Sequence, residues 1–137
     1  MRSLNLQTTI VSVALTASVI CLVAACSSDH ALVVSDIGND RVAATLGKPA
    51  AALLLDVRSV GEFESGHIPG SVNIPHDELG SRIDEIATHR ETGIVVYCER
   101  GFRASKAATV LQNEGFKSIQ HLAGDMSGWR SAGLPIE

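Results

Sequence analysis

The chain has 137 residues, of which 45% are apolar and 19% charged, and 11 lysines and arginines stand against 15 aspartates and glutamates. This length has room for one hydrophobic core of useful size, and the composition is that of a packed globular chain, which excludes a largely disordered protein. The net charge of −4 is spread along the chain without a basic stripe, so a nucleic-acid partner is not expected.

The first 25 residues carry one charged side chain, Arg2, and an apolar stretch that runs from residue 10 to residue 25. A charged start, an apolar run and small residues before a processing point are typical of an export signal. Residues 22–26, Leu-Val-Ala-Ala-Cys, resemble the lipobox of bacterial lipoproteins, in which the cysteine is acylated and becomes the new N-terminus. The resemblance implies a signal peptide over residues 1–25, lipidation of Cys26, and a tether over residues 26–32.

This reading places the domain in the bacterial cell envelope, anchored by lipid and facing the periplasm or the exterior. The alternative is an uncleaved anchor, because the uncharged run of residues 3–28 would reach about 39 Å as a helix, enough to span a bilayer. In both cases the domain is tethered to a membrane.

The chain has three cysteines. Cleavage before Cys26 removes Cys21, and the lipid occupies the sulfur of Cys26, so Cys98 alone keeps a free thiol and no internal disulfide can form. A lone thiol in an exported protein is an oxidation liability, which favours either a fully buried cysteine or a reactive one.

The elements of the domain, predicted over residues 33–137, begin with a short strand over residues 31–34. A helix over residues 40–46 follows, capped by Asn39 and ended by Gly47. The continuous apolar run of residues 51–57 is typical of a strand buried on both faces.

The middle of the chain has weaker patterns. One helical turn is expected over residues 60–65 and a short strand over residues 71–74, stopped by Pro75. From residue 77 onward, apolar side chains recur at helical spacing and predict an amphipathic α-helix. These side chains are Leu79, Ile83, Ile86 and Ala87.

The last third alternates clearly between strand and helix. Residues 94–97 predict a second buried strand, residues 104–114 a helix, residues 119–122 a short strand, and residues 126–131 a final helical turn. Strands that alternate with helices of this length indicate an α/β fold with a central parallel sheet and helices on both faces.

Cys98 directly follows the predicted strand over residues 94–97, at the sheet edge where α/β proteins bind ligands. Backbone N–H groups of the next residues and the N-terminus of the following helix are expected to face the sulfur and favour the thiolate. Arg100, Arg103 and Lys106 add positive charge, and Gly101 allows a tight turn. The alternative is an inert cysteine beside ordinary surface arginines.

Several motifs in the same order resemble those of a single rhodanese (sulfurtransferase) domain. They are residues 55–58 (Leu-Asp-Val-Arg), 62–63 (Glu-Phe), 66–75 (Gly-His-Ile-Pro-Gly-Ser-Val-Asn-Ile-Pro), 97–103 (Tyr-Cys and the following loop) and 124–129. The resemblance covers about residues 33–135 and implies a compact three-layer α/β fold, with no metal or organic cofactor.

The same resemblance implies that Cys98 attacks the outer sulfur of a small anionic donor such as thiosulfate and carries the sulfur as a persulfide. A thiol or protein acceptor then removes it, in a ping-pong cycle. The backbone amides of Glu99, Arg100, Gly101, Phe102 and Arg103 would hold the persulfide, and the side chains of Arg103 and Arg100 would orient the donor.

Two other functions remain open from the sequence. A rhodanese-fold module could bind a protein or an anion without catalysis. Phosphate or arsenate chemistry is less expected, because four residues separate Cys98 from Arg103, whereas related cysteine phosphatases have five. Glu99 departs from the family pattern, since an acid at this position opposes both thiolate formation and thiosulfate binding.

The remaining polar residues have supporting roles in this interpretation. Asp56 and Arg58, at the end of the strand over residues 51–57, are expected to brace the Cys98 loop or to line the site. His67 is expected to make a structural hydrogen bond, and Trp129 and Phe63 to lie in the core or a pocket wall. Phe102 is expected to form one wall of the pocket entrance or a docking point for a partner. The five histidines lack metal-ligand spacing, so no zinc site is expected: His30, His67, His76, His89 and His121.

Overall fold

The computed structural model describes residues 34–49 and 52–137. The predicted signal peptide over residues 1–25, the tether over residues 26–32 with Cys26, and the start of the domain at residue 33 lie outside the described residues. In the described residues, no helix is long and apolar enough to cross a membrane.

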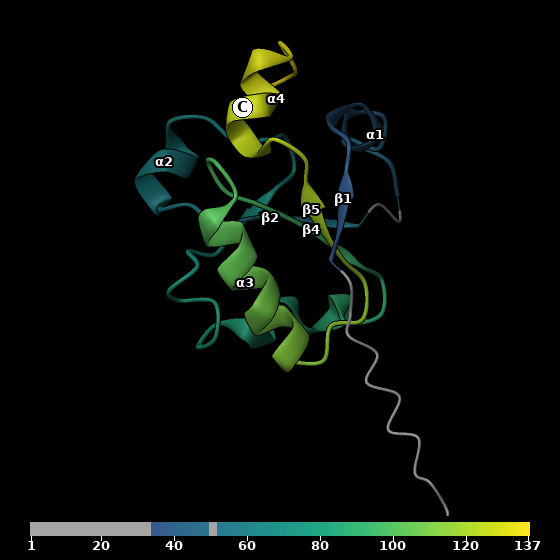
Figure 1. The fold of residues 1–137 in the computed structure, drawn as a ribbon, viewed down its shortest axis with the longest axis vertical. Coiled ribbons are helices and arrows are strands. Elements are labelled where there is room, and N and C mark those ends of the chain that lie inside the picture. Colours follow the sequence, from purple (N-terminus) through teal and green to yellow (C-terminus); the bar gives the residue numbers. More distant parts are fainter. Residues whose placement is uncertain (1–33, 50–51) are drawn as a thin grey trace, which may run out of the picture.

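Five strands form one parallel sheet in the order β1-β5-β4-β2-β3 (Figure 1). Their bounds are β1 Ser35–Ile37, β2 Leu53–Asp56, β3 Val72–Asn73, β4 Ile94–Tyr97 and β5 Ile119–Leu122. The predicted strands over residues 94–97 and 119–122 are confirmed, and those over residues 51–57 and 71–74 are shorter than predicted. The predicted strand over residues 31–34 is misplaced in its described part, since Val34 precedes β1.

The central strands β2 and β4 are buried on both faces, as their continuous apolar runs predict. Alternate residues of β4 therefore enter two different cores: Val96 packs in one cluster and Val95 in the other. The first cluster contains side chains of α3 (Phe102–Asn113), and the second contains those of α4 (Asp125–Ser131) and Val42 of α1 (Asn39–Ala43). The chain therefore has the three-layer α/β architecture that the sequence predicts.

Helices α1, α3 and α4 have different bounds from those that the sequence predicts. Helix α1 is shorter than predicted, and Gly38, not Asn39, is its N-cap. Helix α3 begins at Phe102, two residues earlier than predicted, because Gly101 takes the left-handed conformation (φ 96°) that turns the chain directly into the helix. Helix α4 includes Asp125, one residue before its predicted start.

The predicted amphipathic α-helix from residue 77 onward is wrong in type. Residues 77–81 form turns, and η1, a 3₁₀ helix, spans Ile83–His89. Leu79, Ile83 and Ile86 are nonetheless buried, as the pattern predicts. Spacings of three and four residues bury one face in either helix type, so the pattern identified the buried face and not the hydrogen-bond geometry.

Helix α2 spans Val60–Glu64 and has the capping box of a well-defined N-terminus. Glu62 N–H donates to the Ser59 hydroxyl, and the Ser59 N–H donates to the Glu62 carboxylate. The Ser-x-x-Glu spacing of residues 59–62 in the sequence is the local signal for this start. It also fixes where the Glu62 carboxylate lies, which matters at the site described next.

Candidate active site around Cys98

Cys98 lies at the carboxyl end of the central strand β4, where the chain turns into α3. The residue is 1% exposed, and its sulfur accepts a hydrogen bond from the backbone N–H of Gly101 at 3.1 Å. The turn requires the positive φ of Gly101, and a Cβ there would lie 3.2 Å from Asp125 Oδ2. The loop thus directs a backbone donor at the sulfur, at the N-terminus of a 12-residue helix.

An open pocket of about 490 Å³ lies over this loop. It is lined by Cys98, Glu99, Arg100, Phe102 and Arg103, which are five of the six loop residues that the sequence selected. Gly101, the sixth, supplies the N–H on the sulfur. Phe102 is 72% exposed and forms part of the wall, so the sulfur is reached past an apolar ring.

Arg103 is held by Glu62 of α2 and is not a free cation. Its two terminal nitrogens lie 2.6 and 2.7 Å from the two carboxylate oxygens, a bidentate ion pair. These hydrogen bonds raise the pKa of Arg103 well above its usual range, against desolvation, and the Cys98 side chain adds to the effect. The same pair holds the pKa of Glu62 far below its ordinary value.

Glu99 is also paired within the chain. Arg130 of α4 donates to one carboxylate oxygen at 2.7 Å, and Nη1 of Arg58 lies 3.5 Å from the other. Two guanidinium groups therefore share this negative charge, which offsets the opposition to an anion that the sequence predicted for an acid at this position. Nη1 of Arg58 is buried and makes no hydrogen bond within the described part of the chain, and its charge faces the Glu99 carboxylate.

Asp56 and Arg58 lie beneath the loop, fully buried, and do not line the pocket. Arg58 donates through Nε and Nη2 to the Asp56 carboxylate, at distances of 2.6 to 3.0 Å, and through Nη2 to the carbonyl of Gly66. Because Arg58 also faces Glu99, this buried pair links the end of β2 to the Cys98 loop. Of the two roles expected from the sequence, the contacts correspond to bracing.

The first turn of α4 clamps the beginning of the Cys98 loop. The N–H groups of Met126 and Ser127 donate to the carbonyls of Cys98 and Glu99, at 3.0 and 3.2 Å. The N–H of Cys98 donates in turn to Oδ1 of Asp125 at 2.8 Å. Sequence reasoning missed Asp125, because an acid in the first turn of a helix is too common to indicate a contact with a distant loop.

His67, Phe63 and Trp129 lie away from the sulfur. Nδ1 of His67 lies 3.0 Å from the Phe63 carbonyl, and the two rings stack with centroids 3.6 Å apart. Trp129 is fully buried, and its ring N–H donates to the carbonyl of Pro135. His67 and Trp129 thus have the structural roles expected for them. Phe63 does not: it is half-buried against His67, belongs to neither hydrophobic core cluster and lines none of the pockets described among these residues.

Comparison with known proteins gives a family assignment. The model of the rhodanese-like domain matches residues 38–132. A sulfurtransferase of Allochromatium vinosum is 30% identical over 103 residues, which are 75% of this chain and 94% of that protein. The chloroplastic thiosulfate sulfurtransferase 16 of Arabidopsis thaliana is 33% identical over 93 residues, covering 61% of this chain and 78% of that one.

Solved structures agree with the fold. The crystal structure of a thiosulfate sulfurtransferase from Pseudomonas aeruginosa superposes with a TM-score of 0.69 and 30% sequence identity, over 75% of this chain and 20% of that chain. Two other relatives are also longer, and the chain spans 37% and 55% of their lengths. The same domain thus occurs alone and as a part of larger proteins.

Proposed function

The chain belongs to the rhodanese-like domain family, and on this premise we propose that it is a sulfurtransferase that carries sulfane sulfur on Cys98. One observation carries the proposal: the Cys98 sulfur accepts the Gly101 N–H at the floor of an open pocket of about 490 Å³, next to the N-terminus of α3. We expect the sulfur donor to be thiosulfate or a similar small anion, because two of the relatives are named thiosulfate sulfurtransferases.

In the first half-reaction, the Cys98 thiolate attacks the outer sulfur of thiosulfate. A new bond forms between Sγ and that sulfur, the S–S bond of the donor breaks, and sulfite leaves with the electron pair. In the second, a thiolate of a small molecule or protein attacks the outer sulfur of the persulfide and releases the Cys98 thiolate. Neither step needs a proton to move or a cofactor to take part.

The charges around the pocket favour a small anion. Arg100 is exposed at the rim, and the Lys106 ammonium lies 4.6 Å from the centre of the Phe102 ring. Glu99, which lines the pocket, and Glu62, which binds Arg103, are each paired with arginine. The negative charge of the persulfide and that of the donor therefore meet the positive charges of Arg100 and Lys106, for which the described residues show no ion pair.

Intact-mass measurement tests this function directly. Incubation of the purified protein with thiosulfate is expected to add one sulfur, about 32 Da, and C98A is expected to remove the addition. The matched control is C21S, measured on unprocessed protein that keeps residues 1–25; it changes a cysteine outside the proposed chemistry and should load normally. If the wild type gains no sulfur with any sulfane donor and instead retains a specific partner, the non-catalytic binding module is correct.

We also propose that the protein is lipid-anchored in the bacterial cell envelope. The support is the likeness of residues 22–26 to a lipobox, with Cys26 as the acylated residue. The mass of the protein isolated from bacterial membranes should correspond to a chain that starts at Cys26 and carries acyl groups. C26S should leave the precursor unprocessed, and an unmodified full-length chain in the membrane would instead indicate the uncleaved anchor.

A further inference from the structure

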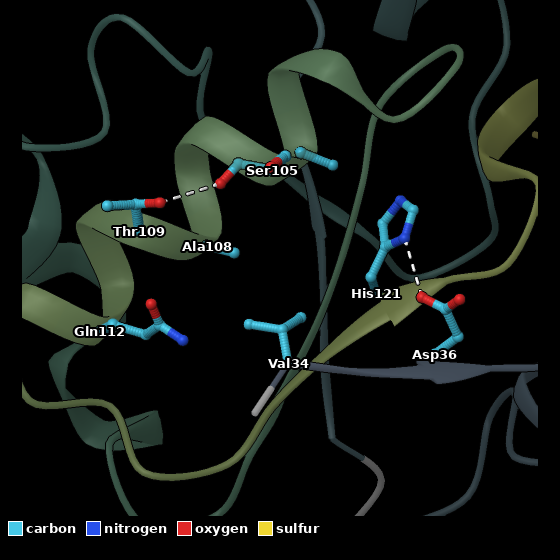
Figure 2. A pocket seen from close by; sticks show the side chains of 8 residues that line it. Val34, Asp36, Ser105, Ala108, Thr109, Gln112 and His121 are labelled. Carbon is cyan, nitrogen blue, oxygen red and sulfur yellow. Dashed lines mark hydrogen bonds and ion pairs between the residues drawn. The ribbon is translucent and has the colours of Figure 1, made fainter. Parts of the chain in front are cut away.

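Three side chains form a chain of contacts that leads from the surface to the backbone of the nucleophile. His121 on β5 lies between two carboxylates: Nδ1 is 3.1 Å from Oδ1 of Asp36 on β1, and Nε2 is 3.0 Å from Oδ2 of Asp125. Figure 2 shows the His121 ring directed at Asp36. We call Asp36, His121 and Asp125 the acid–histidine relay. Its inner end is the hydrogen bond from the Cys98 N–H to Asp125.

The geometry of the relay requires a particular protonation state of His121. A carboxylate only accepts hydrogen bonds, and a neutral imidazole has one N–H, so it can donate to one carboxylate and must present a lone pair to the other. Only the imidazolium donates to both. Hydrogen bonding to Asp125 raises the pKa of His121, against desolvation, and the contact with Asp36 adds to this.

Asp125 is placed where this protonation state matters. It is 2% exposed, and its backbone has a positive φ of 54°, which residues other than glycine rarely adopt. Against the desolvation caused by burial, its contact with His121 and the Cys98 N–H hold its pKa low. A buried carboxylate in a strained backbone needs its partners, and here the partners are His121 and the Cys98 loop.

We propose that the imidazolium of His121 is a positioning residue: it holds the Asp125 carboxylate on the Cys98 N–H, and the rate of sulfur loading falls when His121 loses its proton. This inference rests on the sulfurtransferase function proposed above. Loss of the proton turns one of the two ring contacts into a repulsion between a lone pair and a carboxylate. It also leaves two negative charges without a counterion beside the site of thiolate attack.

Among the described residues, Asp36 and Asp125 are the two carboxylates in contact with His121. The pocket of about 260 Å³ beside it is lined on the α3 side by uncharged residues (Figure 2). They are Ala104, Ser105, Ala108, Thr109 and Gln112. Asp36 from β1 is the other titratable residue in that lining, and Asp125 from α4 lies on the other side of the ring. The Cys98 loop also packs against the ring, since a Cβ on Gly101 would lie 3.6 Å from His121, and the Cys98 side chain interacts with Asp125. The groups that face the His121 proton are therefore the two carboxylates and, through Asp125, the Cys98 thiol.

The test uses D36N, because Asp36 is an exposed residue that touches neither the sulfur nor its loop. Removing one of two carboxylates should lower the pH at which His121 titrates, because the contact with Asp36 helps to raise the pKa of His121. In NMR titrations of the full-length protein, the His121 ring and the Cys98 amide should titrate with the same midpoint in the wild type. Both midpoints should move down together in D36N.

The loading rate with thiosulfate gives the second readout. The loss of this rate as the pH rises should share the midpoint of His121 and move down by the same interval in D36N. The matched control, D84N, removes an exposed acid on η1 and should leave the profile unchanged. A purely structural role of the relay would change the amount of folded protein without moving the midpoint.

The two readouts separate failure of the inference from failure of the function. A Cys98 amide that does not follow His121, or a midpoint that stays in place in D36N, overturns the inference whether or not sulfur is loaded. If the wild type shows the coupled titration but never gains sulfur, the coupling of His121 to the Cys98 loop stands. The proposed function and the effect of His121 on the loading rate are then both refuted.

Discussion

The ion pair between Arg103 and Glu62 leads to a prediction about donor binding. An anionic donor that enters the pocket must compete with the Glu62 carboxylate for the N–H groups of Arg103. We therefore expect E62Q to bind thiosulfate more tightly than the wild type. Glutamine keeps the shape of the side chain. Its amide oxygen can still accept from the Ser59 N–H, and its backbone N–H can still donate to the Ser59 hydroxyl, so α2 should keep its N-terminus.

The size of the effect follows from the geometry and exposure of the pair. The two charge-assisted hydrogen bonds are short, but the side chains are 26% and 36% exposed, so solvent screens much of their attraction. Exposed pairs contribute about 0.2–1 kcal/mol, and the bidentate geometry favours the upper end. If the loss of this pair makes the binding free energy of thiosulfate more favourable by about 1 kcal/mol, the half-saturating concentration of thiosulfate in E62Q should be roughly fivefold lower than in the wild type.

Single-turnover loading measures this quantity, with the rate of persulfide formation followed against thiosulfate concentration at neutral pH. The pKa of Glu62 is lowered in the folded protein, chiefly by the hydrogen bonds from Arg103, so the pair is complete above the ordinary value of 4.5 and is lost only as the pH falls through the lower folded value. At neutral pH the ion pair between Glu62 and Arg103 is therefore fully formed in the wild type.

A matched control is available on η1, where Glu85 makes a bidentate pair with Arg82 at 2.7 and 2.9 Å. E85Q removes the same kind of contact from a pair that lines none of the pockets described above, and it should leave donor binding unchanged. Equal affinity in E62Q and the wild type, or weaker binding in E62Q, would refute the idea that Glu62 competes with the donor.

Two further predictions concern stability. R58M should lower the free energy of unfolding in urea by about 3–5 kcal/mol, because it leaves the buried Asp56 carboxylate without its ion-pair partner. R41M, at an exposed position, should change it by no more than about 0.5 kcal/mol, and an equally small loss in R58M would contradict the stabilising role of the buried pair. The pKa of His121 is raised above its ordinary 6.5, so its contribution is complete below that pH and is lost as the pH rises through the folded value. H121Q should therefore be less stable than the wild type by about 1–2 kcal/mol near pH 5, and the gap should narrow as the pH rises; a gap that widens with pH would contradict this sign.

The sheet and the position of the nucleophile follow from patterns that are local in the sequence. Continuous apolar runs identify β2 and β4 because a strand buried on both faces needs apolar residues at every position. Alanine and leucine at helical spacing identify the buried face of α3. Cys98 is found because the chain order puts it at the end of a buried strand, and the glycine that follows shortly after permits the turn.

The pairing of charges could not be read in this way. From the sequence, Arg100 and Arg103 are equivalent cations and Glu99 is an acid that opposes an anion. In the folded chain, Arg103 meets Glu62 and Glu99 meets Arg130, which lie 41 and 31 residues away along the sequence. These contacts depend on how α2 and α4 pack against the loop.

Asp125 shows most clearly which contacts the sequence predicts and which depend on the tertiary structure. The sequence by itself predicts a helix that contains Trp129, with Asp125 just before it, and a strand that ends at Cys98. Asp125 and Cys98 are 27 residues apart in the sequence. Only the tertiary structure brings that acid to the Cys98 N–H and places His121 behind it. Secondary structure follows from the period of neighbouring side chains, whereas a hydrogen bond between distant segments exists only when strand order, register and helix packing together bring its two atoms to within about 3 Å.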